Sequence, residues 1–434
     1  MRLIGGIPEL LPAFFIAFLA AALISFALTP VIRAIARRID LVDQPNHRRV
    51  NTQPIARGGG IAVVLAFLAV ALVLTLLVAA GSLAGFTLPA SIGPNELLAL
   101  FGGTALAAIL GLLDDMLNLR ARWQLLTQLV LALGAVLLGI TIDSIANPFG
   151  PGQLPLDGVW GVAFTIFWIV GMINSINWID GLDGLSSGIG LIAAFTLALI
   201  SLTVSAGVFG QPYVALMCFA LAGAILGFLR WNFHPASIFV GTSGVMVMGY
   251  SLAVLSILGT AKVAVALLVL GVPIIDTFWN IVRRLANGSS PFTPDRGHVH
   301  HRLMDLGLSQ TRAVLVIYGL TLVLAVLSVL LSGAGQLYAF VGVVVASGFI
   351  LLILTRRALV IDDFRAESYE DDEPVHPVAV PVRAERPEVA SREAAPGRPE
   401  SAGPEPVRIE TAAVRVEPIP AKVEALPNKP VRPG

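Results

Sequence analysis

Eleven long apolar runs constrain the fold of this chain more than any other feature of its sequence. A helix needs about 20 apolar residues to cross a bilayer, and only a helix satisfies every backbone polar group locally inside hydrocarbon. The 434 residues are 56% apolar and 13% charged, with a mean hydropathy of +0.84, which does not suit a water-soluble globule. We therefore expect an all-α, polytopic integral membrane protein. The predicted transmembrane helices centre on 10–32, 59–80, 96–113, 123–141, 157–173, 185–206, 212–229, 238–258, 262–282, 312–332 and 335–355.

The arginines of the connecting loops follow odd-numbered spans. They are Arg33 to Arg57, Arg120 and Arg122, Arg230, Arg283 to Arg302, and Arg356 and Arg357. The alternate loops at 81–95, 142–155, 207–211 and 333–334 contain no Lys or Arg. Because short loops rich in positive charge stay in the cytoplasm, the pattern predicts an N-terminus outside and a C-terminus inside the cell.

The chain divides near residue 357. Residues 1–357 form the predicted membrane domain, and 358–434 are rich in Pro, Glu, Val, Ala and Arg without periodicity. That composition predicts a disordered cytoplasmic tail. The formal net charge is zero and gives no reason to expect a nucleic-acid partner. The single cysteine, Cys218, excludes an intrachain disulfide and a cysteine-rich metal cluster.

Polar residues interrupt the apolar pattern in five segments, all at predicted cytoplasmic ends of spans or in the loops between them. Ionisable groups near bilayer depth are costly, so these residues are functional candidates. The first segment has Asp114 and Asp115 at the end of span three, with Asn118 one turn beyond. Adjacent carboxylates repel unless a cation or a proton intervenes, which suggests Mg²⁺, a basic substrate group or a general base. A hydrated helix end explains the pair equally well.

The second segment, NSINWIDGLDGLSSG, has Asn174, Asn177, Asp180 and Asp183 at intervals of three residues, interleaved with glycines. Carboxylate and amide oxygens suit a hard divalent cation, and glycines permit close approach of a phosphate to the backbone. The spacing does not match an EF-hand. This segment is the strongest indication of a metal-assisted phosphate site.

The third and fourth segments are weaker indications when taken alone. Gly241, Thr242 and Ser243 open span eight, where their backbone amides are suited to an anion, although a small-residue packing surface is the favoured explanation. Asp276 lies in span nine about two turns before Arg283. It indicates either a cavity or a structural ion pair.

The fifth segment is a basic loop with Arg296, His298, His300, His301 and Arg302. Guanidinium groups match phosphate oxygens, and imidazoles donate to them. A zinc site ranks lower because the histidines lack the usual helical spacing, and a solvated basic loop is the plainest alternative. Together the five segments predict a magnesium-dependent phosphoryl-transfer site, and their place in apolar helices implies a lipid reactant.

Five motifs resemble those of a known family. They are QPNHRRVNTQPIARGGG at 44–60, LLDD at 112–115, NxxNxxDGxDGL at 174–185, PIIDT at 273–277 and DRGHVHH at 295–301. The pattern resembles the polyprenyl-phosphate N-acetylhexosamine-1-phosphate transferases, glycosyltransferase family 4, and within it the bacterial undecaprenyl-phosphate N-acetylglucosaminyl-1-phosphate transferases. The peptidoglycan branch, which transfers phospho-N-acetylmuramoyl-pentapeptide, has three consecutive histidines, whereas Val299 interrupts the row here.

The resemblance implies a bacterial inner-membrane enzyme with its active site at the cytoplasmic face. It would transfer GlcNAc-1-phosphate from a UDP-sugar to undecaprenyl phosphate and release UMP, as the first membrane step of an envelope polysaccharide. Mg²⁺ is the implied cofactor, with Mn²⁺ as a substitute, and a homodimer is compatible with the sequence.

The resemblance also implies roles for single residues. The implied catalytic residues are Asp114, Asp115 and Asp180. Substrate binding would involve Asn174, Asp183, Asp276, Arg296, His298, His300 and His301, and the metal ligands would be Asn177 and Asp180. Many relatives have an Asp in the F-x-G-D-x-G-S motif that is held to bind magnesium, and Thr242 occupies this metal-ligand position here.

Three other interpretations stay open on the sequence. The peptidoglycan transferase is one, and a catalytically silent protein that binds the lipid carrier is another, because Thr242 lacks the charge of the usual Asp. A transporter ranks last, since its ionisable residues would lie at mid-bilayer rather than at one face.

Overall fold

The computed structural model describes residues 2–3, 7–44, 53–147, 149–150, 152–204, 211–259, 262–286, 288, 298–331 and 333–349. These residues belong to one compact unit, Met1–Ser368. The predicted tail at 358–434 and Arg296 of the basic loop lie outside the described residues.

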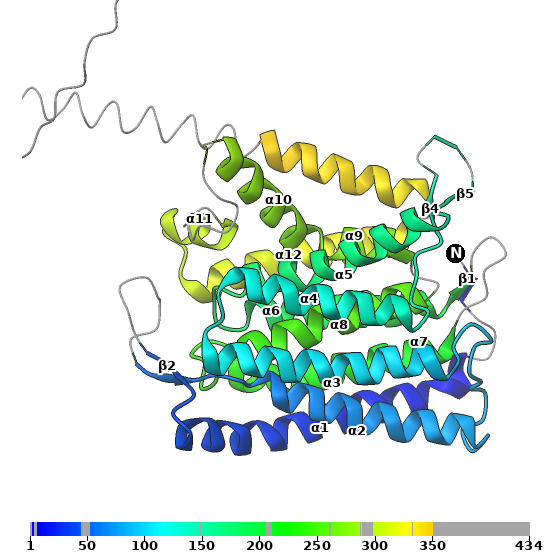
Figure 1. Ribbon diagram of the computed structural model, residues 1–434, viewed down its shortest axis with the longest axis horizontal. Helices are drawn as coiled ribbons and strands as arrows, with labels where there is room; N and C mark the ends of the chain where they lie inside the picture. The colour runs from blue at the N-terminus through cyan, green and yellow to red at the C-terminus, as the bar shows by residue number, and fades with distance from the viewer. Residues whose placement is uncertain are drawn as a thin grey trace, which may run out of the picture. The chain divides into compact units, whose positions relative to one another are not determined.

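Helices form most of the described part of this unit (Figure 1). In chain order they are α1 Ile7–Arg38, α2 Gly60–Ala79, α3 Pro94–Leu117, α4 Ala121–Leu137, α5 Val159–Ile179, α6 Leu185–Ser201, α7 Pro212–Asn232, α8 Gly241–Leu258, α9 Lys262–Val269, α10 Gly271–Ala286, α11 Val299–Asp305 and α12 Gln310–Leu330. A further apolar helix covers Ala334–Phe349.

Seven of the described helices are long and apolar enough to cross a membrane, or eight if the bent pair α9 and α10 is one span. The prediction of a polytopic helical membrane protein is therefore confirmed. Three shorter apolar helices, α4, α6 and Ala334–Phe349, lie within the remaining predicted runs. The count of eleven spans and the orientation of the termini stay predictions.

The predicted ninth span is not a straight helix. Its two halves, α9 and α10, meet at an angle of 78°. Pro273 lies in the first turn of α10, where it has no backbone N–H to donate to Val269 and its ring would clash with that carbonyl in a continuous helix. The bend brings Asp276 of α10 into the neighbourhood of α11.

Three short antiparallel strand pairs depart from the all-α prediction. They are β1 (Arg2–Leu3) with β6 (Thr203–Val204), β2 (Val42–Asp43) with β3 (Ile55–Ala56), and β4 (Ser144–Ala146) with β5 (Gln153–Pro155). Only β3 extends its pairing, through a parallel bridge from Ala56 to Ile238. That bridge fastens the loop before α2 to the loop before α8.

Glycines allow the central helix α7 to pack closely on α1. A Cβ at Gly223 or Gly227 would lie about 2 Å from a backbone oxygen of α1. Small residues four apart let membrane helices approach closely enough for backbone contact. Most of α7 and nearly all of α8 are buried, so these two helices form the rigid centre from which the loops at each end project.

Candidate active site

The described parts of the five polar segments meet at one end of the helical bundle, the end that carries β2 and α11 in Figure 1. The end of α3 contacts the start of α8 through Asp115 and Thr242. The turn between α5 and α6 contacts the α7–α8 loop through Asp183 and His234, and the bent helix α10 contacts α11 through Asp276. The β1–β6 and β4–β5 pairs lie at the opposite end (Figure 1). The predicted gathering of the polar segments is thus present in the structure.

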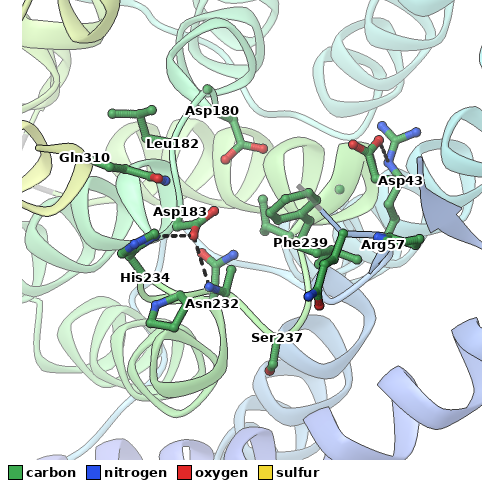
Figure 2. A pocket seen from close by; sticks show the side chains of 18 of the residues that line it. Asp43, Arg57, Asp180, Leu182, Asp183, Asn232, His234, Ser237, Phe239 and Gln310 are labelled. Carbon is green, nitrogen blue, oxygen red and sulfur yellow. Dashed lines mark hydrogen bonds and ion pairs between the residues drawn. The ribbon is translucent and has the colours of Figure 1, made fainter. Parts of the chain in front are cut away.

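A cavity of about 690 Å³ opens at this end. Its walls come from the end of α1, the β2–β3 pair, the α5–α6 turn, the α7–α8 loop, α11 and the start of α12. In the view of Figure 2, Asp183 and His234 lie on one side, Asp43 and Arg57 on the other, and Asp180 between them. A cavity with acidic and basic walls suits a ligand that carries both phosphate and hydroxyl or amide groups.

Asp115, in the last turn of α3, is enclosed by the start of α8. Its carboxylate accepts hydrogen bonds from the backbone N–H of Thr242 (2.8 Å), the backbone N–H of Ser243 (3.1 Å) and the hydroxyl of Ser243 (2.9 Å). The guanidinium of Arg57 lies 3.7 Å away. Asp115 of α3 therefore caps the N-terminus of α8. Its negative charge is also stabilised by the positive end of the α8 helix dipole.

The Asp114 carboxylate is bound by residues of the turn after α3 and of α4. Its carboxylate accepts from the backbone N–H of Leu119 (3.0 Å) and from the Gln124 amide (3.0 and 3.1 Å). Asp114 and Asp115 are only 5% and 2% exposed, so the explanation of the pair as a hydrated helix end is wrong. Neither residue borders the cavity described above.

Asp180, at the end of α5, borders the cavity and accepts one side-chain hydrogen bond, from the Ser186 hydroxyl at 2.5 Å. Burial raises the pKa of Asp180 to about 7, and the charges of Asp115 and Asp183 raise it further against the opposing effects of Ser186 and Arg57. Near neutral pH this carboxyl therefore exchanges a proton readily and gains from a nearby cation. Such a group is suited to chemistry in the cavity.

The other polar residues of the second segment have different surroundings. Asp183 accepts from the backbone N–H of Ala236 (3.0 Å) and pairs with Nδ1 of His234 (2.8 Å). Asn174 exchanges hydrogen bonds with Gln128 of α4. Among the residues that the structure describes, no side-chain hydrogen bond holds the Asn177 amide.

Asp276 organises the start of α11. Its carboxylate pairs with Nδ1 of His298 (2.6 Å) and accepts from the backbone N–H of Val299 (2.8 Å). Asn280, one turn later on α10, donates to Asp276 and contacts the same His298 nitrogen. Asp276 thus holds the histidine segment against α10, and the bend at Pro273 makes this contact reachable.

The histidines differ in access to the cavity. His301 borders it. His300 is 2% exposed and stacks between His298 and His301, with ring centroids 5.7 and 4.3 Å away. Burial lowers the pKa of His300 to about 3, so its ring is neutral at physiological pH. Within the described part of the chain, neither of its ring nitrogens has a hydrogen-bond partner.

The glycines of the second segment make room for side chains of the protein itself. A Cβ at Gly181 would lie 2.3 Å from Nε2 of His300, and one at Gly188 would lie 1.9 Å from the Tyr318 ring. Gly184 has a φ of +78°, which favours glycine. At Gly188 the missing side chain makes room for protein packing. Gly181 also borders the cavity, where a close approach by phosphate stays a prediction.

Arg57 and His234 are two of the polar cavity residues that the sequence did not single out as site residues. Arg57 lies 3.7 Å from both Asp43 and Asp115 and donates to the Asn118 side chain at 3.3 Å. His234 pairs with Asp183. The sequence contains only a weak indication of these two residues. Arg57 lies in the QPIARGGG stretch and His234 opens the HPASIFVG stretch, but the residues they contact are distant in sequence.

The apolar spans and the polar cavity at one end of the bundle define a multi-pass membrane protein with a partly enclosed polar site. Residues 97–260 match the model of glycosyl transferase family 4. The chain is 32% identical over 325 residues to the probable undecaprenyl-phosphate N-acetylglucosaminyl 1-phosphate transferase of Bacillus subtilis, covering 74% of this chain and 85% of that protein.

Two further relatives have similar identity. The decaprenyl-phosphate N-acetylglucosaminephosphotransferase of Mycolicibacterium smegmatis is 32% identical over 69% of this chain and 77% of its own length. The undecaprenyl-phosphate alpha-N-acetylglucosaminyl 1-phosphate transferase of Haemophilus influenzae is 32% identical over 75% and 86%, respectively. The chain belongs to glycosyl transferase family 4.

Proposed function

We propose that this protein transfers GlcNAc-1-phosphate from UDP-GlcNAc to a polyprenyl phosphate, undecaprenyl phosphate in the first instance, and releases UMP. The names of the relatives support the reaction class. The observation that carries the proposal is the position of Asp180, a carboxyl with a raised pKa that borders the same cavity as Arg57. A membrane enzyme with a lipid acceptor also explains why the cavity lies at one end of apolar helices.

In this reaction an oxygen of the lipid phosphate attacks the β-phosphorus of the donor. The bond from that phosphorus to the bridging oxygen breaks, and UMP leaves with the electron pair. Arg57 and His301 border the cavity where the diphosphate would lie, and a guanidinium favours the charge that develops on phosphate oxygens. Asp180 is the residue placed to bind a cation or to hold a proton there.

The residues at the cavity fit a magnesium ion that substrate oxygens help to bind. No group of three or more His, Cys, Asp or Glu suited to a metal occurs among the described residues, and we propose that substrate oxygens complete the coordination. Asp180 borders the cavity, and we propose the side-chain oxygens of Asn177 and Thr242 as further protein ligands of the ion. Mg²⁺ is commonly held by one or two carboxylates together with substrate phosphates, and when bound it would neutralise phosphate charge. Mn²⁺ is the expected substitute.

The location of the reaction is also part of the proposal. The arginines that predict a cytoplasmic face include Arg57, which borders the cavity, Arg120, which follows α3, and Arg230, in the last turn of α7. We therefore place the active site at the cytoplasmic face of a bacterial inner membrane, with eleven spans and the N-terminus outside. The product would begin an envelope polysaccharide.

A donor screen tests the proposed reaction. Purified full-length protein is incubated with undecaprenyl phosphate, Mg²⁺ and each of several UDP-N-acetylhexosamines, and the lipid product is identified by mass spectrometry. We expect a lipid-diphosphate-GlcNAc product from UDP-GlcNAc. The absence of product with every donor, beside a working control enzyme, would contradict the proposal.

A catalytically silent lipid-carrier binding protein is the second candidate, favoured by Thr242 alone. The backbone N–H of Thr242 contacts Asp115, and Thr242 follows Gly241, which borders the cavity, but its side chain has no charge. Thr242→Asp separates the two candidates. An active transferase turns over before the substitution, whereas a silent protein gains turnover only after it.

A further inference from the structure

Outside the cavity, two arginines contact one tryptophan where α1 and α7 approach their C-terminal ends. The guanidinium carbon of Arg33 lies 5.3 Å from the Trp231 ring centroid, and that of Arg230 lies 5.9 Å from it. The indole N–H of Trp231 donates to the backbone oxygen of Phe26 at 3.1 Å, and the two rings are 5.3 Å apart. The indole is thus held in one orientation by α1, with two cations beside it.

No carboxylate balances these two cations within the described residues, since neither Arg33 nor Arg230 forms an ion pair there. Cation–π contact and the negative end of the helix dipole explain why one arginine is stable at such a position. A second like charge beside the same ring adds repulsion. Each guanidinium also keeps five N–H donors in a planar fork that matches phosphate oxygens.

The surroundings are those of a membrane interface. Trp231 and the two arginines lie toward the ends of two long apolar helices, which is where tryptophan and arginine gather at the boundary between lipid and water. Phe26, Val31 and Ile35 of α1 are 43%, 52% and 47% exposed in the bundle, and such apolar side chains suit acyl chains. A basic position between transmembrane helices is typical of a headgroup site.

We propose that Arg33, Arg230 and Trp231 form a binding site for the phosphate headgroup of an anionic membrane phospholipid. The two guanidinium groups bind the phosphate, and the indole holds them in place. Neither arginine borders the cavity, so this site is separate from the proposed reaction. Its occupant is a lipid of the surrounding bilayer rather than a substrate.

The test measures lipid binding by the purified full-length protein in a non-ionic detergent. Phosphatidylglycerol, phosphatidylcholine with the same acyl chains, and inorganic phosphate are added separately. Retained lipid is counted by native mass spectrometry, and the melting temperature is followed with each addition. The variants are R33Q/R230Q and, as a matched control, R122Q, because Arg122 also contacts an indole, that of Trp123 at 5.7 Å, but does so without a second arginine.

We expect the wild type and R122Q to retain phosphatidylglycerol equally and to show a higher melting temperature with it than with phosphatidylcholine. The double variant should bind phosphatidylglycerol at least about tenfold more weakly, since each arginine near an anionic surface contributes a factor of about five. Equal retention by the double variant would overturn the proposal, as would an equal thermal shift with inorganic phosphate. If the double variant does not fold, R230Q alone, at an exposed position, should bind about fivefold more weakly, and unchanged binding would again overturn it.

Discussion

Two carboxylates at the same end of the bundle have opposite surroundings. Asp115 accepts three hydrogen bonds from the start of α8 and lies beside Arg57, so its charge is already used in joining α3 to α8. Asp180 accepts one side-chain hydrogen bond and borders the cavity. Both belong to acidic motifs, yet only Asp180 is placed to meet a ligand. A carboxylate near the site is therefore not necessarily reactive, because hydrogen bonds from a neighbouring helix can already stabilise its charge.

The largest expected effect is the loss of turnover in the Asp180→Asn variant. We expect kcat to fall by about 10²- to 10⁴-fold, the range for loss of a group that holds a proton or a cation at the reacting atoms. The melting temperature should stay the same or rise, because the amide removes a buried carboxyl whose charged form is disfavoured. UMP release and thermal unfolding measure the two quantities.

Asp305→Asn is the matched control for that variant, since Asp305 is an exposed carboxylate on α11, and its kcat should be unchanged. Full activity in Asp180→Asn would remove the proposed distinction between the two aspartates.

The second prediction concerns the fold rather than the reaction. Asp115→Ala should lower the free energy of unfolding by about 3–5 kcal/mol, because two backbone N–H groups and one hydroxyl at the start of α8 lose their acceptor. Asp43 still pairs with Arg57 in this variant. Ser243→Ala, which removes a single hydroxyl donor, should cost about 1 kcal/mol. Chemical or thermal unfolding in detergent gives both values. An Asp115→Ala protein of normal stability that has lost only turnover would make Asp115 a reactive group.

A smaller effect is expected at the contact of Gly181 with His300. The Cβ of Gly181→Ala would lie 2.3 Å from Nε2 of His300, and overpacking of this kind costs about 1–3 kcal/mol. Gly134→Ala is the control, since a Cβ there meets nothing within 4 Å and alanine favours a helix. Combining Gly181→Ala with His300→Ala should remove most of the loss. Additive losses in the double variant would mean that the two residues do not interact.

The smallest net effect is expected in the pH dependence of wild-type stability without metal, because two opposing titrations largely cancel there. The pKa of Asp180 is raised from 3.8 to about 7, so the folded state retains a proton that the unfolded chain loses, and stability falls as pH rises through this window. The pKa of His300 is lowered from 6.5 to about 3. Between these two pH values the His300 ring binds a proton in the unfolded chain but not in the folded protein. The free energy of unfolding therefore rises with pH between about 3 and 6.5.

The two contributions oppose each other in the wild type. Asp180→Asn should leave a melting temperature that rises with pH between about 4 and 6. His300→Ala should leave one that falls with pH up to about 7. Melting curves in a chelator at several pH values measure these slopes. Identical slopes in the two variants would contradict the assignment of the opposite pH dependences to Asp180 and His300.

The sequence predicted the helices because each apolar run is long and continuous. It did not predict the bend before Pro273, since a proline is tolerated at the start of a helix as well as at a kink, nor the β2–β3 pair, whose strands have only two residues each. The polar segments were located correctly. Contacts between distant residues decide which side chains border the cavity. Ser243 and Asp115, for example, are 128 residues apart, and spacing along the chain does not predict such contacts.

The central claim is that a phosphosugar, rather than a sugar, moves to the lipid at this cavity. UDP-GlcNAc labelled with ³²P at the β-phosphate tests it directly, in a reaction with undecaprenyl phosphate and Mg²⁺ followed by separation of lipid from water-soluble products. The label should appear in the lipid fraction with unlabelled UMP in the aqueous one. Label that stays in water as UDP would show cleavage at the sugar carbon and would contradict the account.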